Sequence, residues 1–93
     1  MIHAHIIVSG QVQGVGYRAF VLREAEIIGG ISGRVRNMSD GVRVEIIAEG
    51  SSDDINTLIE RLWQGPYHSK VKNVEVNKHN IKENRFNNFI ITY

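Results

Sequence analysis

GQVQGVGYR, residues 10–18, separates a segment with the periodicity of a β-strand from a segment with the periodicity of a helix. Residues 2–8 alternate with a period of two, which is typical of a half-buried strand. Residues 17–28 carry apolar side chains at helical offsets, which make one face of a helix: Tyr17, Phe20, Val21, Ala25 and Ile28. Gly29 and Gly30 predict the end of this helix.

The middle of the chain predicts a hairpin and a second helix. Extended runs at 34–39 and 42–48 meet at Ser39-Asp40-Gly41, and Asp-Gly between two such runs is a strong hairpin signal. The helix is expected after Gly50, with Ser51 and Ser52 as possible caps and Gly65-Pro66 as its end. Its expected apolar stripe is Ile55, Leu58, Ile59, Leu62 and Trp63.

The last third predicts a strand at 71–76, a polar loop at 77–85 and a closing strand at 86–93. The resulting order is βαββαβ with an extra C-terminal strand. Two helices with one apolar face each must both cover one side of the sheet, so we expect an α+β, ferredoxin-like α/β sandwich with an antiparallel sheet. The length fits a single domain spanning 1–93.

Composition excludes several classes of function. Eleven Lys and Arg against ten Asp and Glu give a net charge of +1, so we expect neither a nucleic-acid nor a membrane partner. No run of residues is apolar enough to cross a bilayer and no signal peptide is visible, which favours a cytoplasmic location. With no cysteine, disulfides and thiolate chemistry are impossible. No segment has an unexplained apolar face, so we expect a monomer.

The loop before the first helix is a candidate anion site. A helix N-terminus offers free N–H groups, and Gly14 and Gly16 allow backbone angles that turn further N–H groups toward one point. Arg18 could add a guanidinium fork to the same phosphate. The alternative is that the glycines make only a tight turn and Arg18 is a surface residue.

Two better-known phosphate motifs do not fit. Gly14-x-Gly16-x-x-Ala19 superficially matches a dinucleotide fingerprint, but the chain is too short for a doubly wound sheet. A nucleotide P-loop needs Gly-Lys-Ser/Thr, which is absent. An RNA-binding domain of this fold would need aromatic-rich strand motifs for base stacking, and the chain lacks these motifs.

Two polar groups on the predicted strands are further candidates. Asn37 shares a strand face with Val35, so its amide could point toward the helices and hold a water; alternatively it is a turn residue that bonds its own backbone. His3 and His5 share a face at a spacing that could hold a metal, but no third ligand accompanies them. His68 and His79 are expected in solvated loops.

The two motifs together resemble the acylphosphatase family. The resemblance rests on Gly-x-Val-Gln-Gly-Val-Gly-Tyr-Arg at 10–18 and Gly-x-Val-x-Asn-x-x-Asp-Gly at 33–41, followed by Ala-Glu-Gly at 48–50 and Gly-Pro after a helix. It extends to the terminal Phe89 and Tyr93. The chain departs from the family pattern in three places. Arg34 stands where relatives often have an aromatic residue, and there are apparent extra residues near Gly30 and Val42. We expect a β-bulge to absorb each extra residue.

The resemblance implies a metal-independent hydrolase, without a cofactor, that converts a small-molecule acyl phosphate to a carboxylate and inorganic phosphate. Inorganic phosphate would then be the product and a competitive inhibitor. The backbone of the loop would hold the phosphoryl group, through Gln13, Gly14, Val15, Gly16, Tyr17 and Arg18. The Arg18 side chain would bind it, and Asn37 would orient the attacking water. The competing hypothesis is a phospholigand-binding module without turnover.

Overall fold

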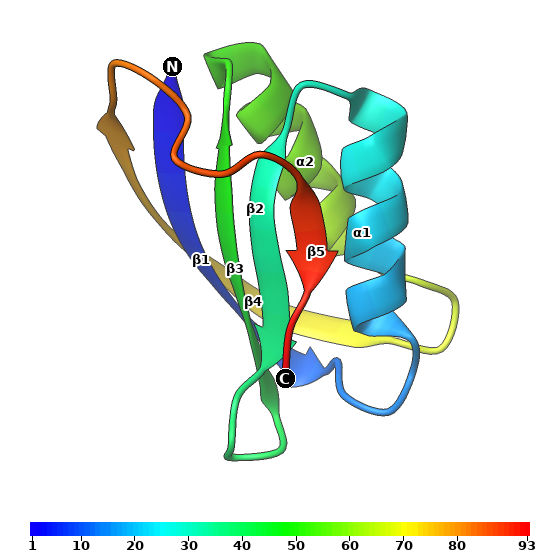
Figure 1. The fold of residues 1–93 in the computed structure, drawn as a ribbon. Helices are drawn as coiled ribbons and strands as arrows, with labels where there is room; N and C mark the ends of the chain where they lie inside the picture. Colours follow the sequence, from blue (N-terminus) through cyan, green and yellow to red (C-terminus); the bar gives the residue numbers. More distant parts are fainter.

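Five strands form one sheet, in the order β4-β1-β3-β2-β5, in the computed structural model, which describes residues 1–93. Both helices lie on the same face of this sheet (Figure 1). The elements are β1 (Ile2–Gln11), α1 (Tyr17–Ile28), β2 (Ser32–Asn37), β3 (Arg43–Gly50), α2 (Ser52–Gln64), β4 (Lys70–Asn80) and β5 (Phe89–Ile91). The predicted element order and ferredoxin-like sandwich are therefore confirmed.

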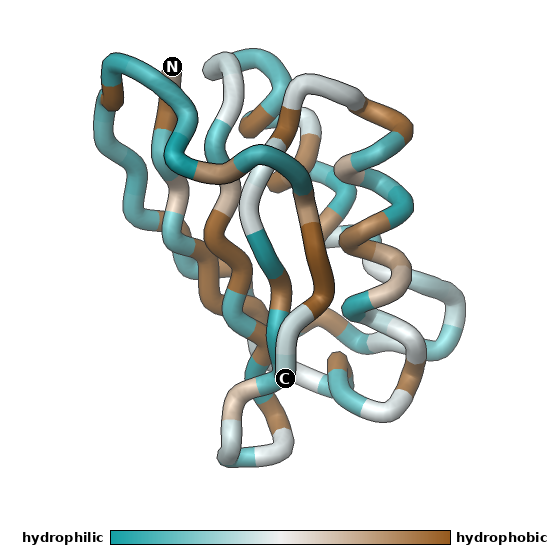
Figure 2. The backbone as a smooth tube through the Cα atoms, in the orientation of Figure 1, coloured by the Kyte–Doolittle hydropathy of each residue, from teal (hydrophilic) through white to brown (hydrophobic).

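The core lies between the central strands and the helices. In β1 the buried residues Ala4, Ile6 and Val8 alternate with partly exposed ones, as the period of two predicts. Hydrophobic residues recur along the central strands and along both helices (Figure 2). The rest of the core comes from β2, β3 and both helices, and includes Val35, Val44, Ile46, Ala48, Phe20, Val21, Ala25, Ile55, Leu58 and Leu62.

One buried hydrogen bond joins the N-terminus of α1 to the C-terminus of α2. The Tyr17 hydroxyl donates to the Leu62 carbonyl at 2.7 Å. The usual helical donor to this carbonyl would be the amide four residues later, but that residue is Pro66, which has no N–H. Tyr17 therefore satisfies a carbonyl that would otherwise be orphaned, and its burial raises the pKa of its phenol.

Helix α2 begins at Ser52, and the Ser51 side chain caps it by accepting a hydrogen bond from the Asp54 amide at 3.1 Å. The predicted stripe is correct except for Trp63, which is 49% exposed. The buried surface of α2 is narrower than its apolar stripe: Ile55, Leu58 and Leu62 are buried, and Ile59 is partly buried against the core. Neither helix is long and apolar enough to span a membrane.

The C-terminal strand differs from the prediction in two respects. Strand β4 continues to Asn80, so His79 lies on a strand and not in a loop, while β5 covers only Phe89–Ile91. Moreover, β5 pairs in parallel with β2, which makes the sheet mixed. The reason is the path of residues 81–88, the crossing segment, which carries the chain over the sheet to its opposite edge (Figure 1). It delivers β5 at the end where β2 begins.

The expected β-bulges near Gly30 and Val42 are not present. Strand β3 pairs with β1 and β2 in unbroken register, and the only shift lies between Ser9 and Gly10, where β1 pairs with β4. Gly33 has a φ of 143°, and a Cβ there would overlap the carbonyl of Ile47. A glycine is thus required at this position for close backbone approach within a hairpin of unbroken register.

Candidate active site

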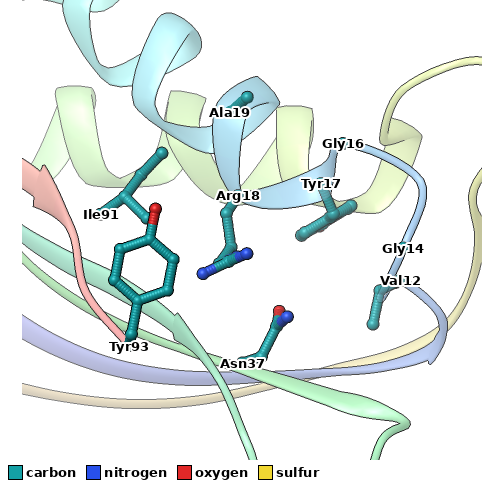
Figure 3. A pocket seen from close by; sticks show the side chains of 9 residues that line it. All are labelled: Val12, Gly14, Gly16, Tyr17, Arg18, Ala19, Asn37, Ile91 and Tyr93. Carbon is teal, nitrogen blue, oxygen red and sulfur yellow. The ribbon is translucent and has the colours of Figure 1, made fainter.

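A pocket of about 270 Å³ lies where the N-terminus of α1, the ends of β1 and β2 and the C-terminus of the chain meet. Its walls carry one charged side chain, Arg18, and one side-chain amide, Asn37. Figure 3 shows both side chains pointing into the same space. The remaining lining residues are Val12, Gly14, Gly16, Tyr17, Ala19, Ile91 and Tyr93.

The loop wall of the pocket is rich in free main-chain donors. Gly14 and Gly16 adopt left-handed φ values of 74° and 78°, which only glycine reaches without strain. Among backbone hydrogen bonds outside the regular elements, none is donated by residues 12–19, and the first donor of α1 is Phe20, which bonds Gly16. The loop and first helical turn therefore hold several N–H groups without a protein acceptor, at the positive end of the helix dipole.

The loop is fastened to the hairpin by Gln13. Its side-chain amide donates to the Met38 carbonyl at 2.9 Å and to the Arg43 carbonyl at 2.8 Å. This contact ties the loop before α1 to the turn that follows Asn37. The two sequence motifs are thereby held against each other, although 14 residues, 19–32, lie between them along the chain.

Arg18 is oriented by the end of the chain. Its guanidinium Cζ lies 4.7 Å from the centroid of the Tyr93 ring, and Nη1 makes a long hydrogen bond of 3.4 Å to the Thr92 carbonyl. These contacts use one of the five N–H donors of the guanidinium. The others are free for a ligand, and the guanidinium faces Asn37 across the pocket (Figure 3).

Asn37 is the last residue of β2 and shares the inward face with the buried Val35, as the alternation predicts. Its carbonyl oxygen Oδ1 is buried and has no hydrogen-bond partner within the protein. Its side chain is not bonded to the turn at Asp40, whose carboxylate instead accepts from the amides of Val42 and Arg43 at 3.0 Å. The structure therefore does not support the turn-residue alternative for Asn37.

The structure brings most of the predicted site residues together. Gly14, Gly16, Tyr17, Arg18 and Asn37 line the pocket. The side chains of the remaining two point elsewhere: that of Gln13 toward the hairpin, and that of Val15 against the core.

Sequence reasoning did not identify the apolar wall of the pocket, which consists of Val12, Ala19, Ile91 and the Tyr93 ring. Alternation marks Val12 as inward-facing, but no local pattern places Ile91 and Tyr93 beside residues more than 70 positions earlier.

Other titratable groups are engaged away from the pocket. Asp40 belongs to the hairpin turn, and hydrogen bonds from the Val42 amide and the Arg43 side chain lower the pKa of its carboxyl. Glu24 forms an ion pair with Arg61 at 3.6 Å, which joins the two helices.

The histidines are also placed elsewhere. His3 and His5 bond Glu49 and Glu45, at 2.6 and 2.8 Å, on the sheet face opposite the helices. No group of three or more His, Cys, Asp or Glu side chains is arranged to hold a metal ion.

Comparison with known proteins identifies the family and agrees with the fold. The family model described as Acylphosphatase matches residues 4–91. An acylphosphatase of Caldivirga maquilingensis is 40% identical over 92 residues, which cover 99% of this chain and 95% of that relative. An acylphosphatase of Deinococcus radiodurans is 51% identical over 69 residues, which cover 74% of this chain and 77% of that relative. The crystal structure of acylphosphatase from Bacillus subtilis superimposes with a TM-score of 0.92 at 40% identity, with both chains fully covered. This chain belongs to the acylphosphatase family.

Proposed function

We propose that this protein hydrolyses the carboxyl-phosphate bond of acyl phosphates to a carboxylate and inorganic phosphate, without a metal ion. The observation that carries the proposal is the position of Arg18 and Asn37 on one pocket whose loop wall has free main-chain amides. Membership of the acylphosphatase family supports the substrate class. The arrangement supplies positive charge on one side of a bound phosphoryl group and an amide on the other.

The binding step uses the loop and Arg18. Main-chain N–H groups of residues 13–18 and the guanidinium fork of Arg18 contact the non-bridging oxygens of the phosphoryl group. These donors also neutralise charge on the same oxygens as the transition state forms, and losing one such donor typically raises the barrier by about 3 kcal/mol. This supply of fixed positive charge is the reason that we propose catalysis without a metal.

The reaction step uses Asn37. Its buried Oδ1, which has no protein partner, accepts a hydrogen bond from the attacking water and so holds its oxygen in line with the phosphorus. The water oxygen bonds to phosphorus while the bond from phosphorus to the carboxylate oxygen breaks, and the carboxylate leaves with the bonding electrons. A carboxylate is a good leaving group, so no strong acid is needed to protonate it.

The proton of the water goes to an oxygen of the substrate's own phosphoryl group. No carboxylate or histidine lines the pocket, and the nearest candidates by sequence, Glu24 and Asp40, are held by Arg61 and Arg43. A pH-rate profile in which a protein carboxylate or histidine must titrate for turnover would contradict this assignment.

Hydrolysis of benzoyl phosphate by the purified protein, in the presence of a chelator, tests the proposal. We expect turnover that inorganic phosphate inhibits competitively and that added magnesium does not increase. If phosphate binds but benzoyl phosphate is not hydrolysed, the protein is a phospholigand-binding module. If turnover requires a divalent cation, the metal-independent mechanism is wrong.

A further inference from the structure

The C-terminal residues that orient Arg18 are held by few main-chain hydrogen bonds. Strand β5 has three residues, lies at the edge of the sheet and pairs only with β2. Beyond it, the Thr92 amide donates to the Val35 carbonyl at 2.8 Å, and the Tyr93 side chain is almost fully exposed. Phe89 and Ile91 pack against the core, and β5 also lies against α1. A three-residue edge strand nevertheless opens by local unfolding more readily than the central strands, so a further contact in the preceding segment helps to keep this end of the chain in place.

That contact lies in the crossing segment, residues 81–88. Its ends are held by a hydrogen bond from the Ile81 amide to Met1 and by one from the Gly33 amide to Asn88. Between these ends, Arg85 is the only residue that hydrogen-bonds to the body of the protein. The segment is mostly hydrophilic (Figure 2), and only Ile81 and Phe86 of its eight residues are partly buried.

Arg85 is bound by Glu49, the one fully buried charged residue of the chain, with 0% exposure. The Arg85 amide donates to Oε1 at 2.7 Å, Arg85 Nε donates to Oε2 at 3.2 Å, and His3 Nδ1 lies 2.6 Å from the same Oε2. Burial opposes the charge of Glu49, but the hydrogen bonds from Arg85 and His3 outweigh it and lower the pKa of the carboxyl. Glu49 is therefore an ionised anchor for the middle of the crossing segment.

We propose that Glu49 is a positioning residue for the pocket: by holding Arg85, it keeps β5, Thr92 and Tyr93 in the place where they orient Arg18. The chain of contacts runs from Glu49 to Arg85, then along the three residues 86–88 into β5, and ends at the Arg18 guanidinium. Glu49 does not line the pocket, so it acts only through these residues. The consequence for phosphate affinity rests on the function proposed above.

The same strand offers a matched control. Glu45 lies four residues before Glu49 on the same sheet face and also contacts an arginine and a histidine, Arg36 Nε at 2.6 Å and His5 Nε2 at 2.8 Å. The partners belong to the neighbouring strands β2 and β1, and no hydrogen bond joins either of them to the crossing segment. Glu45→Gln therefore removes the same chemistry without releasing the C-terminus.

The test compares Glu49→Gln, Arg85→Ala and Glu45→Gln by amide hydrogen exchange and phosphate binding. In Glu49→Gln we expect the amides of residues 89–92 to exchange about tenfold faster or more, because the hydrogen bonds of Arg85 to a charged group are lost. Arg85→Ala should speed exchange of the same amides by a smaller factor, because it removes the Nε bond to Oε2 but keeps the main-chain bond to Oε1. Core amides of β1 should not show this local acceleration: their protection should still match the free energy of global unfolding measured for the same variant. If the segment is then open about two-thirds of the time, phosphate affinity falls roughly threefold, because only the closed fraction binds.

Kinetics separate positioning from a loss of fold. Substrate restores the closed form at saturation, so KM should rise in Glu49→Gln and Arg85→Ala while kcat stays close to that of the unmodified protein. Should Glu49→Gln fail to fold, Arg85→Ala decides, because the Arg85 side chain is 59% exposed and does not support the core. A measurable acceleration at 89–92 is still expected there, from the loss of the Nε bond alone.

Two results would overturn the proposal: a folded Arg85→Ala variant with unchanged exchange at 89–92, or a Glu45→Gln variant with the same local acceleration as Glu49→Gln. If the unmodified protein does not hydrolyse acyl phosphates, the proposed function fails, whereas the exchange data still decide whether Glu49 anchors the C-terminus.

Discussion

Replacing Asn37 by alanine separates phosphate binding from water attack. The Asn37 side chain makes no hydrogen bond within the protein, so the substitution breaks none of the bonds that hold the fold. We therefore expect the free energy of unfolding to stay within about 0.5 kcal/mol of that of the unmodified protein. The loop amides and Arg18 are untouched, so affinity for inorganic phosphate should change by less than about threefold, or under ~0.7 kcal/mol.

Turnover of the Asn37→Ala variant should nevertheless collapse. A preorganised hydrogen-bonding group at the reacting centre is worth about 10²–10³ in kcat, or roughly 3–4 kcal/mol. The assay is steady-state hydrolysis of benzoyl phosphate, with phosphate binding followed separately by calorimetry. Asn73→Ala, which removes an exposed asparagine from β4, is the matched control and should leave kcat unchanged. A kcat within threefold of the unmodified protein, or phosphate affinity that falls as much as kcat, would refute the role assigned to Asn37.

Four further predictions follow from contacts elsewhere in the chain. Arg18→Ala should lower phosphate affinity and kcat together, each by about tenfold or more, because the guanidinium contacts both the bound phosphate and the transition state; loss of only one would contradict this. Tyr17→Phe should destabilise the protein by about 1–3 kcal/mol in denaturant titrations, since the buried Leu62 carbonyl loses its partner, while kcat is retained. Gly33→Ala should lower stability by roughly 2 kcal/mol or more, because its Cβ meets the Ile47 carbonyl at a φ of 143°; an equally stable variant would show that the hairpin relaxes freely. The folded-state pKa of Glu49 is below its ordinary 4.5, so its charge stabilises the fold fully above pH 4.5, and this contribution is lost as the pH falls through the lower folded-state value. Glu49→Gln should therefore make the free energy of unfolding less dependent on pH in that acidic range.

Local periodicity was sufficient to predict both helices and the central strands. The alternation in residues 2–8 and the helical spacing after Tyr17 each reflect burial against one neighbouring layer, and that burial is visible in a single segment. Trp63 shows the limit of the same reasoning, because it belongs to the apolar stripe of α2 but lies beyond the surface that the sheet covers. Periodicity identifies a face but not how much of it is buried.

The C-terminal part could not be predicted from local pattern. Strand β5 pairs in parallel with residues 33–35, and the crossing segment is held by Glu49, which lies 36 residues before Arg85. Neither interaction leaves a periodic signal in the polar stretch that contains Arg85. The same distinction holds for the candidate site. The glycine loop, Arg18 and Asn37 could be predicted from local motifs, whereas the wall formed by Ile91 and Tyr93 depends on the path of the whole chain.

The central claim is that the loop amides and the Arg18 guanidinium bind one tetrahedral anion opposite Asn37. Titration of the ¹⁵N-labelled protein with inorganic phosphate, followed by amide and arginine side-chain resonances, tests it most directly. The account predicts saturable shifts, with a single dissociation constant, at the amides of residues 13–18 and at Arg18 Nε. Shifts confined to other basic residues such as Arg85, or loop amides that do not respond at saturating phosphate, would contradict it.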